Sequence, residues 1–340
     1  CQKLAENPEF EPRPFKTDDN NQSVKDLNHL EAEFFFPFLA HSPMEPLNCI
    51  IEPTKNGVRF YDGCQNPSGV QWASSYILGL QPQQIEVKTI YAGGSFGRRN
   101  SPAVKDLYQA EAAIAFALLG KKTPVKLVWD REDDIRGGYY RPMAFHKTKI
   151  GLDANGKILR WDHRIATKSI SKGTDFEKFL VHNGVDHFSV EGCVDTLYQL
   201  PNMSVGLSDF KSSIPVLWWR GVGHTHTAYA MESLLDMVAQ RTGKDPIELR
   251  LDLLNSNDLK QQRMANVLKI SRSRSGWNKG NKRGFAAHYS YKTFVAVVAD
   301  VSATGKQVHI DKLHITVDCG VPVNPDVIRA QMEGGAGYGL

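Results

Sequence analysis

The chain has 340 residues, with 41 basic residues against 37 acidic ones and a formal net charge of +4. This length can bury a large core over about two or three domains, and so small a charge gives no support for nucleic-acid binding. The five cysteines form an odd set without a CxxC pair, which argues against a disulfide scaffold, a zinc ribbon or an iron–sulfur cluster within these residues. No apolar run approaches the roughly 20 residues that a transmembrane helix needs.

The first half of the chain predicts strands and helices in irregular alternation. Residues 1–28 are polar and contain prolines, and they predict an extended lead-in segment. A loop with two prolines runs from His41 to Cys49. The apolar patterns predict strands over 30–36, 58–61, 85–91 and 125–129, and helices over 71–80 and 103–119.

The second half contains two hairpin signals. Asp153 to Gly156 and Ala303 to Lys306 each carry turn residues between two strand patterns. Helices are predicted from Ala228 to Arg241, before Gly243, and over 246–254. The strands that flank the two hairpins are predicted over 148–152, 157–165, 294–301 and 308–317.

A polar, glycine-containing stretch over 271–283 predicts a linker between domains. We therefore expect a first domain over 29–270 and the start of a second domain over 284–340. The expected class is α+β, with mixed sheets, packed helices and hairpins rather than a parallel doubly wound sheet.

The segment from Ala92 to Arg99 follows a predicted strand and precedes a predicted helix. Its glycines, Gly93, Gly94 and Gly97, permit positive φ angles and a close approach of a ligand to the backbone. Two arginines at its end add positive charge and forked donors. Read alone, the segment is either an anion site or an ordinary strand-to-helix turn.

Two further glycine-rich segments repeat this pattern. The first runs from Arg220 to Gly223, between an apolar run and the long helix, and it is either a phosphate or oxyanion site or a tight turn with a surface arginine. In the second, Asn324 caps a helix that has Pro325 at its first position. The four glycines after Glu333 each cost about 1 kcal/mol relative to alanine, so we expect either a ligand or a closely packed helix against them.

Other polar clusters favour plainer interpretations. His224 and His226 share a predicted strand face and could hold a metal ion, but without a third ligand nearby they are interpreted as polar turn residues. The carboxylates from Asp130 to Asp134 predict a solvated charged turn rather than a metal or acid–base site. The basic residues between Arg272 and Arg283 lack a recognised nucleic-acid fold around them. No GxSxG, Walker or HExxH motif occurs, and the Gly93 segment does not fit GxGxxG.

Taken together, the motifs resemble the large cofactor-binding subunits of the molybdenum hydroxylases, the family of xanthine dehydrogenase and aldehyde oxidase, and most of all those of the isoquinoline 1-oxidoreductase type. They occur in the family's order over about 300 of the 340 residues. The matching segments are HSPMEPLNC from His41, CQNP from Cys64, GGSFGRR from Gly93, WDREDD from Trp129, WRGVG from Trp219 with MES from Met231, and the segments 317–324 and 331–340.

The resemblance implies a molybdenum cofactor on a pterin, in its cytosine dinucleotide form. It implies that the Gln65 amide hydrogen-bonds an oxo ligand of molybdenum and that the backbone at Phe96 and Gly97 approaches the metal, with no direct protein ligand to it. The residues that it implies for binding the cofactor are Gly93, Gly94, Ser95, Phe96, Gly97, Arg98, Arg220, Gly221, Gln331, Gly334 and Gly335.

The implied reaction is hydroxylation of an N-heteroaromatic compound or oxidation of an aldehyde, with water as the oxygen source. Electrons would leave through [2Fe–2S] clusters on a separate small subunit, since this chain lacks the cysteines for them. The family's general-base glutamate has no counterpart here; Glu45 and Glu232 lie in matched motifs and are interpreted as structural.

The chain starts at Cys1 and stops at Leu340 inside a helical pattern, so we interpret it as an excerpt that is inactive by itself. Relatives of this type include exported proteins, and the resemblance fits either a cytoplasmic or a periplasmic location. An alternative function is a scaffold or assembly module with the same fold and no cofactor.

Overall fold

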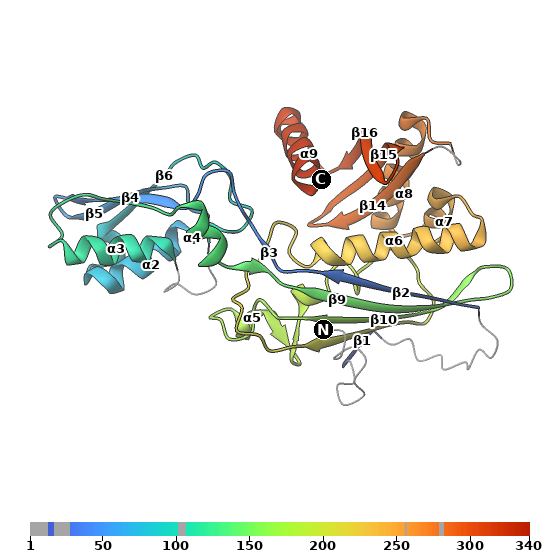
Figure 1. Ribbon diagram of the computed structural model, residues 1–340, viewed down its shortest axis with the longest axis horizontal. Helices are drawn as coiled ribbons and strands as arrows, with labels where there is room; N and C mark the ends of the chain where they lie inside the picture. The colour runs from blue at the N-terminus through green and yellow to red at the C-terminus, as the bar shows by residue number, and fades with distance from the viewer. Residues whose placement is uncertain (1–12, 17–27, 101–106, 256, 279–281) are drawn as a thin grey trace.

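The computed structural model describes residues 13–16, 28–100, 107–255, 257–278 and 282–340 (Figure 1). Two bodies lie side by side in it. The smaller is a four-stranded sheet in the order β6-β5-β4-β7, with α2 and α3 packed together against it. Its elements are β4 (Asn48–Thr54), β5 (Gly57–Asp62), α2 (Pro67–Leu78), β6 (Ile85–Thr89), α3 (Tyr108–Leu118) and β7 (Val125–Val128).

Local signals explain where the elements of the smaller body begin and end. Asn66 caps α2 by accepting the Gly69 N–H at 3.0 Å, Pro67 occupies the first turn, and Gly79 ends the helix in the left-handed conformation. Ile51, Phe60 and other buried apolar residues form a separate core for the smaller body, between its sheet and its two helices. This body carries the loop that follows β6.

The larger body contains a five-stranded sheet, a layer of helices and a three-stranded sheet. Helix α6 contacts β2 of the first sheet and β14 of the second, and α8 contacts β15 and β16. The strand orders are β1-β13-β10-β9-β2 and β14-β15-β16. The elements are β1 (Arg13–Lys16), β2 (Asn28–Phe36), β9 (Ala144–Leu152), β10 (Ile158–Thr167), β13 (Met203–Asp209), α6 (His224–Thr242), α7 (Pro246–Asp252), α8 (Leu259–Ser275), β14 (Arg283–Ser290), β15 (Thr293–Thr304) and β16 (Gln307–Asp318).

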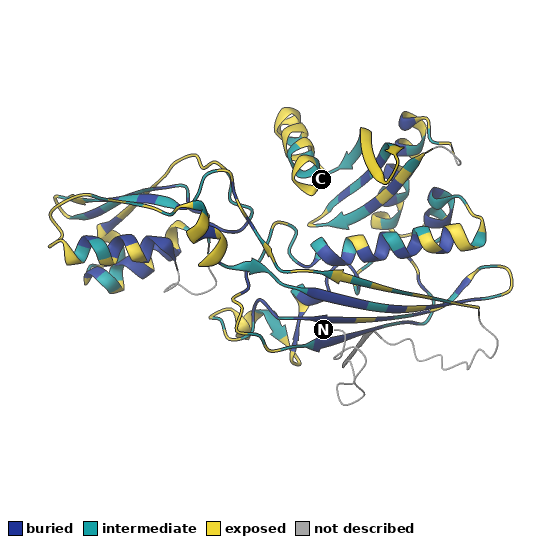
Figure 2. Ribbon diagram, in the orientation of Figure 1, coloured by how far each residue is buried: buried dark blue, intermediate teal, exposed yellow. Residues whose placement is uncertain are grey.

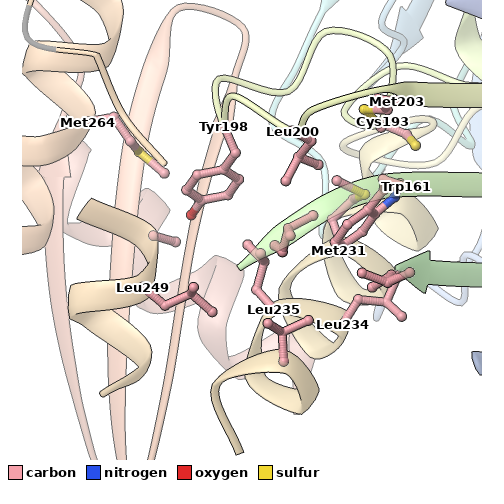
Figure 3. Close-up of a cluster of buried hydrophobic side chains, with 14 of the residues drawn as sticks. Trp161, Cys193, Tyr198, Leu200, Met203, Met231, Leu234, Leu235, Leu249 and Met264 are labelled. Carbon is pink, nitrogen blue, oxygen red and sulfur yellow. The ribbon is translucent and has the colours of Figure 1, made fainter. Parts of the chain in front are cut away.

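One continuous apolar core joins these layers. Trp161 and Met203 from the large sheet lie with Met231 and Leu235 of α6 (Figure 3), and buried residues of β14 and β15 belong to the same cluster. The core therefore includes residues on both sides of the predicted linker, and the domain boundary at 271–283 stays a prediction. Residues 271–275 of that stretch are the last turn of α8 rather than linker.

Helix α9 (Pro325–Gly339) differs from the other long helices because none of its residues is buried, as its colouring in Figure 2 shows. Among the described residues, no helix combines the length and the apolar character that crossing a bilayer requires. The shorter elements are β3 (Leu39–Ala40), η1 (Pro82–Gln84), α4 (Arg131–Arg136), β8 (Tyr140–Arg141), α5 (Glu177–Leu180), β11 (Val181–His182), β12 (Val185–Asp186) and η3 (His187–Ser189).

The α+β class and both hairpins are confirmed: Gly156 and Gly305 take positive φ angles in their turns. The helix expected over 103–119 begins at Tyr108, and residues 101–106 lie outside the described ranges. Most of the lead-in segment also lies outside them, while Arg13–Lys16 forms β1 and pairs with β13.

One expectation holds only in part, and another was wrong. Asp130, Glu132 and Asp133 are exposed, as expected of a solvated charged segment, but Asp130 caps α4 and Asp134 is buried beside Arg98. His224 and His226 do not share a strand face, because α6 begins at His224. The alternating His-Thr pattern has the period of a strand, but tertiary contacts place it in the first turn of a helix.

Candidate functional site

The segment from Gly93 to Arg99 forms a tight loop after β6. Gly94, Phe96 and Gly97 have φ angles of 99°, 56° and 108°. A side chain at Gly97 would place its Cβ 2.4 Å from the carbonyl oxygen of Trp218. Glycine is required there both for the backbone conformation and for the close approach of a second segment.

Glu45 and Arg99 hydrogen-bond the backbone of this loop at Gly93 and Gly94. The Glu45 carboxylate accepts the Gly93 N–H, and the Glu45 N–H donates to the Gly93 carbonyl at 3.1 Å. Buried Arg99 donates to the Gly94 carbonyl at 3.0 Å and to the Glu45 carbonyl at 3.1 Å. The Asn48 amide, with the Gly93 N–H and the charge of Arg99, lowers the pKa of the Glu45 carboxyl despite some burial. Glu45 is therefore a structural anion, as the sequence suggested.

Gln65 lies on the loop's exposed side. Ser95 Oγ donates to Gln65 Oε1 and accepts the Arg99 N–H at 3.1 Å, while the Gln65 N–H donates to the Arg99 carbonyl at 3.1 Å. Among the described residues, none accepts a hydrogen bond from the Gln65 side-chain nitrogen. The side-chain oxygen of Gln65 is thus held by Ser95, while its side-chain N–H groups donate to none of the described residues.

The segment from Trp218 to Gly223 crosses this loop. The Arg220 N–H donates to the Phe96 carbonyl at 2.8 Å, and the buried His41 Nε2 lies 2.9 Å from the Trp218 carbonyl. Gly221 and Val222 have φ angles of 88° and 48°. A left-handed conformation is uncommon for a residue branched at Cβ such as valine, and such strain is concentrated at functional sites.

Helix α9 completes the arrangement. Arg220 Nη2 donates to the side-chain oxygen of Gln331 at 3.0 Å, and the rings of Phe96 and Tyr338 lie 4.4 Å apart between centroids. The structure therefore brings together the three glycine-rich segments that the sequence singled out. They come from both bodies and span almost 250 residues of sequence.

The glycines of α9 are not explained by close helix packing. A Cβ built on Gly334, Gly337 or Gly339 meets no atom within 4 Å among the described residues, and one on Gly335 meets only Arg220 Nη2, at 3.7 Å. Asn324 caps the helix as predicted, accepting the Asp326 N–H at 3.1 Å. Bare backbone is thus exposed on α9 at Gly334 and Gly337, and on another face Gly335 lies next to the Arg220 guanidinium group.

Arg98 differs from the other residues expected to bind an anion. Its guanidinium is buried, with Nε 3.2 Å from Asp134 Oδ1 and its carbon over the Trp129 ring at 5.3 Å. Burial lowers the pKa of Arg98, and Asp134 opposes that shift. The Arg98 charge is therefore compensated inside the protein, whereas that of Arg220 is exposed.

The sequence interpretation missed a row of buried histidines. His146 Nδ1 lies 2.7 Å from His163 Nε2, and its Nε2 lies 2.8 Å from His226 Nδ1. Burial lowers the pKa of all three, to about 3 for His163 and His226, so they are neutral at pH 7. Within the described ranges, no group of three His, Cys, Asp or Glu residues is placed to hold a metal ion. No sequence motif links these three positions.

Two models of the molybdopterin cofactor-binding domain match the chain, over residues 5–254 and 230–340. The chain is similar to the beta subunit of isoquinoline 1-oxidoreductase from Brevundimonas diminuta, with 29% identity over 88% of this chain and 38% of that protein. It is also similar to a membrane-bound aldehyde dehydrogenase (pyrroloquinoline-quinone) of Gluconacetobacter polyoxogenes, with 27% identity over 92% of this chain and 43% of that protein. A third relative is the large subunit of nicotine 6-hydroxylase from Paenarthrobacter nicotinovorans, with 25% identity over 68% of this chain and 28% of that protein.

The chain thus spans between 28% and 43% of the length of these relatives. Among solved structures, quinoline 2-oxidoreductase from Pseudomonas putida 86 superposes with a TM-score of 0.57 at 18% identity, over 82% of this chain and 36% of that one. Reconstituted CO dehydrogenase from Oligotropha carboxidovorans gives 0.56 at 17% identity, over 81% and 36%. These two likenesses show a shared fold.

Proposed function

Because the chain belongs to the molybdopterin cofactor-binding domain family, we propose that it is the cofactor-binding part of an oxidoreductase large subunit. The enzyme would hydroxylate N-heteroaromatic compounds or oxidise aldehydes, with water as the source of oxygen. The proposal rests on one observation: residues 93–99 (the Gly93 loop), residues 220–223 (the Arg220 loop) and helix α9 contact one another.

The residues at this place fit a large anionic cofactor. The bare side of α9 at Gly334 and Gly337 leaves room for a flat group or a phosphate against the backbone, which a β-carbon would reduce. Arg220 supplies an exposed charge beside Gly335, with forked donors suited to a phosphate. We assign Gln331, Gly334 and Gly335 to the pterin or phosphate, and Arg220 with Gly221 to the adjoining side of the site, where Arg220 contacts Gln331.

The Gly93 loop provides the second set of contacts. Gln65 would donate a hydrogen bond from its side-chain nitrogen to an oxo ligand, with Ser95 fixing its other end. By the family resemblance, the backbone at Phe96 and Gly97 would be on the metal side of the cofactor, and contacts within the chain, to Arg220 and Trp218, already hold that backbone in place. When bound, the molybdenum centre would supply two-electron redox chemistry, while these residues would hold and orient it.

Neither glutamate of the matched motifs serves as the general base. Glu45 is occupied by Gly93 and Asn48. Glu232 accepts from Arg250 at 2.9 Å, from Tyr198 at 3.0 Å and from the Ala287 N–H at 2.7 Å. We therefore assign the general base to neither of them.

We further propose the cytosine dinucleotide form of the cofactor and a separate [2Fe–2S] subunit as electron acceptor. The cytosine form follows the family resemblance, and the observation that supports a separate subunit is the scatter of the five cysteines, three of which, Cys49, Cys64 and Cys193, are buried and form no disulfide. The names of two relatives, one a beta subunit and the other a large subunit, describe parts of assemblies with more than one chain.

The test uses the full-length protein purified from its native source with any copurifying subunit. Acid hydrolysis should release cytosine nucleotide, and aldehydes or N-heterocycles should reduce an artificial electron acceptor. An Arg220→Ala variant removes a charge-assisted contact and should bind the cofactor about 10- to 100-fold more weakly. Arg160→Ala is the matched control, since Arg160 is exposed and pairs with Asp162 on its own strand. Equal cofactor content in the two variants would contradict the assignment.

A further inference from the structure

Glu191 is a buried acid beside the Arg220 loop that has no role in the proposal above. Its Oε1 accepts the Gly223 N–H at 2.8 Å. Its backbone carbonyl accepts the Thr227 hydroxyl at 2.7 Å. Gly223 sits so close that a Cβ there would lie 2.7 Å from Glu191 Cγ. Glu191 thus binds the Gly223 N–H, the last amide of the loop, through its side chain, and it binds Thr227 in the first turn of α6 through its backbone carbonyl.

The loop that Glu191 binds needs external support. Val222 has a φ angle of 48°, which costs on the order of 1–3 kcal/mol for such a residue and persists only where neighbouring contacts impose it. The contacts that impose it are the Val222 N–H to the Trp219 carbonyl at 2.6 Å, the Arg220 N–H to the Phe96 carbonyl, and the Gly223 N–H to Glu191. Of these, only the contact to Glu191 involves an ionisable group.

The surroundings of Glu191 make its charge sensitive to pH near neutrality. Burial raises the pKa of the Glu191 carboxyl to about 7, and the negative charges of Asp195 and Asp186 add to this. The N–H groups of Gly223 and His224 act in the opposite direction, because they bind the ionised form more strongly. The titratable groups that act on Glu191 are Asp186, Asp195, His224 and Tyr291, and His187 and His288 act on His224 in turn.

His224 connects Glu191 to the second sheet. Its Nε2 lies 3.7 Å from Glu191 Oε2, and its Nδ1 lies 2.8 Å from His288 Nε2. Burial lowers the pKa of both imidazoles, to about 4 for His288, so both are neutral where Glu191 titrates. Of Glu191, His224 and His288, the residue that changes charge near pH 7 is therefore Glu191.

We propose that Glu191 is a positioning residue that holds the Arg220–Gly223 loop in its strained conformation, and that protonation of its carboxyl weakens this hold. The inference deepens the proposed function and rests on it for the purpose of the loop, because Arg220 and Gly221 are assigned there to the cofactor wall. The hold on the loop is a property of this chain's own residues and can be measured without any cofactor.

The experiment is hydrogen–deuterium exchange of residues 219–225 in the full-length protein between pH 5.5 and 8.5, corrected for intrinsic exchange. Protection in the wild type should fall about fivefold as the pH drops through 7, because a charge-assisted hydrogen bond becomes a neutral one. Glu191→Gln keeps an accepting oxygen and should show protection that does not change with pH. Glu191→Ala should lose protection at every pH.

Glu177→Gln is the matched control. Glu177 also accepts a glycine N–H, that of Gly173 at 2.7 Å, but in an exposed turn elsewhere, so its substitution should leave residues 219–225 unchanged. Superimposable pH profiles of the wild type and Glu191→Gln would overturn the inference, and that comparison remains available should Glu191→Ala fail to fold. Molybdenum content is measured in parallel: a metal-free wild type contradicts the proposed function alone, whereas a flat exchange profile contradicts this inference whatever the metal content.

Discussion

Replacing Gly97 by alanine tests whether the Gly93 loop and the Trp218 segment really meet at backbone distance. Alanine at a φ angle of 108° leaves the conformation that L residues favour, which costs about 1–2 kcal/mol. The new Cβ would also lie 2.4 Å from the Trp218 carbonyl oxygen, so backbone must move, at about 1–3 kcal/mol more. The expected loss of unfolding free energy is thus roughly 2–5 kcal/mol.

The assay is urea unfolding followed by tryptophan fluorescence, with Gly120→Ala as the matched control. Gly120 has a φ angle of 77°, yet a Cβ there meets no described atom within 4 Å, so this variant carries only the conformational cost of about 1–2 kcal/mol. Gly97→Ala should also lower molybdenum content, because it separates Arg220 from Phe96. Equal destabilisation by the two substitutions would refute the close approach on which the site depends.

Three further predictions concern buried polar groups. Because burial lowers the pKa of His163 and of His226 to about 3, their contribution to stability is complete above pH 6.5 and is lost as the pH falls toward about 3; at pH 5 each of these two imidazoles costs about 2 kcal/mol, and His146 acts in the same direction. His163→Gln should therefore reduce the pH dependence of unfolding free energy by about 1.4 kcal/mol per pH unit between pH 6 and 4, and an unchanged slope would argue against a buried neutral imidazole. Arg250→Met leaves the buried Glu232 carboxylate without its ion-pair partner and should lower the unfolding free energy by about 3–5 kcal/mol. Adding Glu232→Gln to the same chain should restore part of that loss. An unchanged unfolding free energy in urea would argue against the buried pair. Finally, burial raises the pKa of the Cys49 thiol, so iodoacetamide at pH 8 should label half-buried Cys319 well before Cys49 by peptide mass spectrometry, and simultaneous labelling would be the contrary result.

Periodicity and turn chemistry predicted most of the individual elements. Gly156 and Gly305 mark their hairpins, and Asn324 with Pro325 starts α9, because each signal acts within a few residues of sequence. The Gly93, Arg220 and α9 segments were also singled out from sequence, since glycine clusters between regular elements are uncommon. Their meeting in space followed only from the family resemblance, because no local signal reports it.

The polar contacts that hold the site could not be predicted. Asp134 looks solvated in a run of carboxylates, and only the fold shows that Arg98, 36 positions earlier, buries it. No sequence motif surrounds Glu191, and the role proposed for it depends on its hydrogen bond with the backbone amide of Gly223, 32 positions later in the chain. His224 and His226 were placed on one strand face and interpreted as turn residues, because their alternation is too short a pattern to show that α6 already begins at His224.

The central claim is that this chain holds a molybdenum cofactor between the Gly93 loop, the Arg220 loop and α9. The most direct measurement is molybdenum per chain, by elemental mass spectrometry, on the full-length protein isolated from its native source with its copurifying subunits. We predict about one molybdenum per chain. Metal-free protein from a molybdenum-replete culture would contradict the account and would favour a scaffold of the same fold.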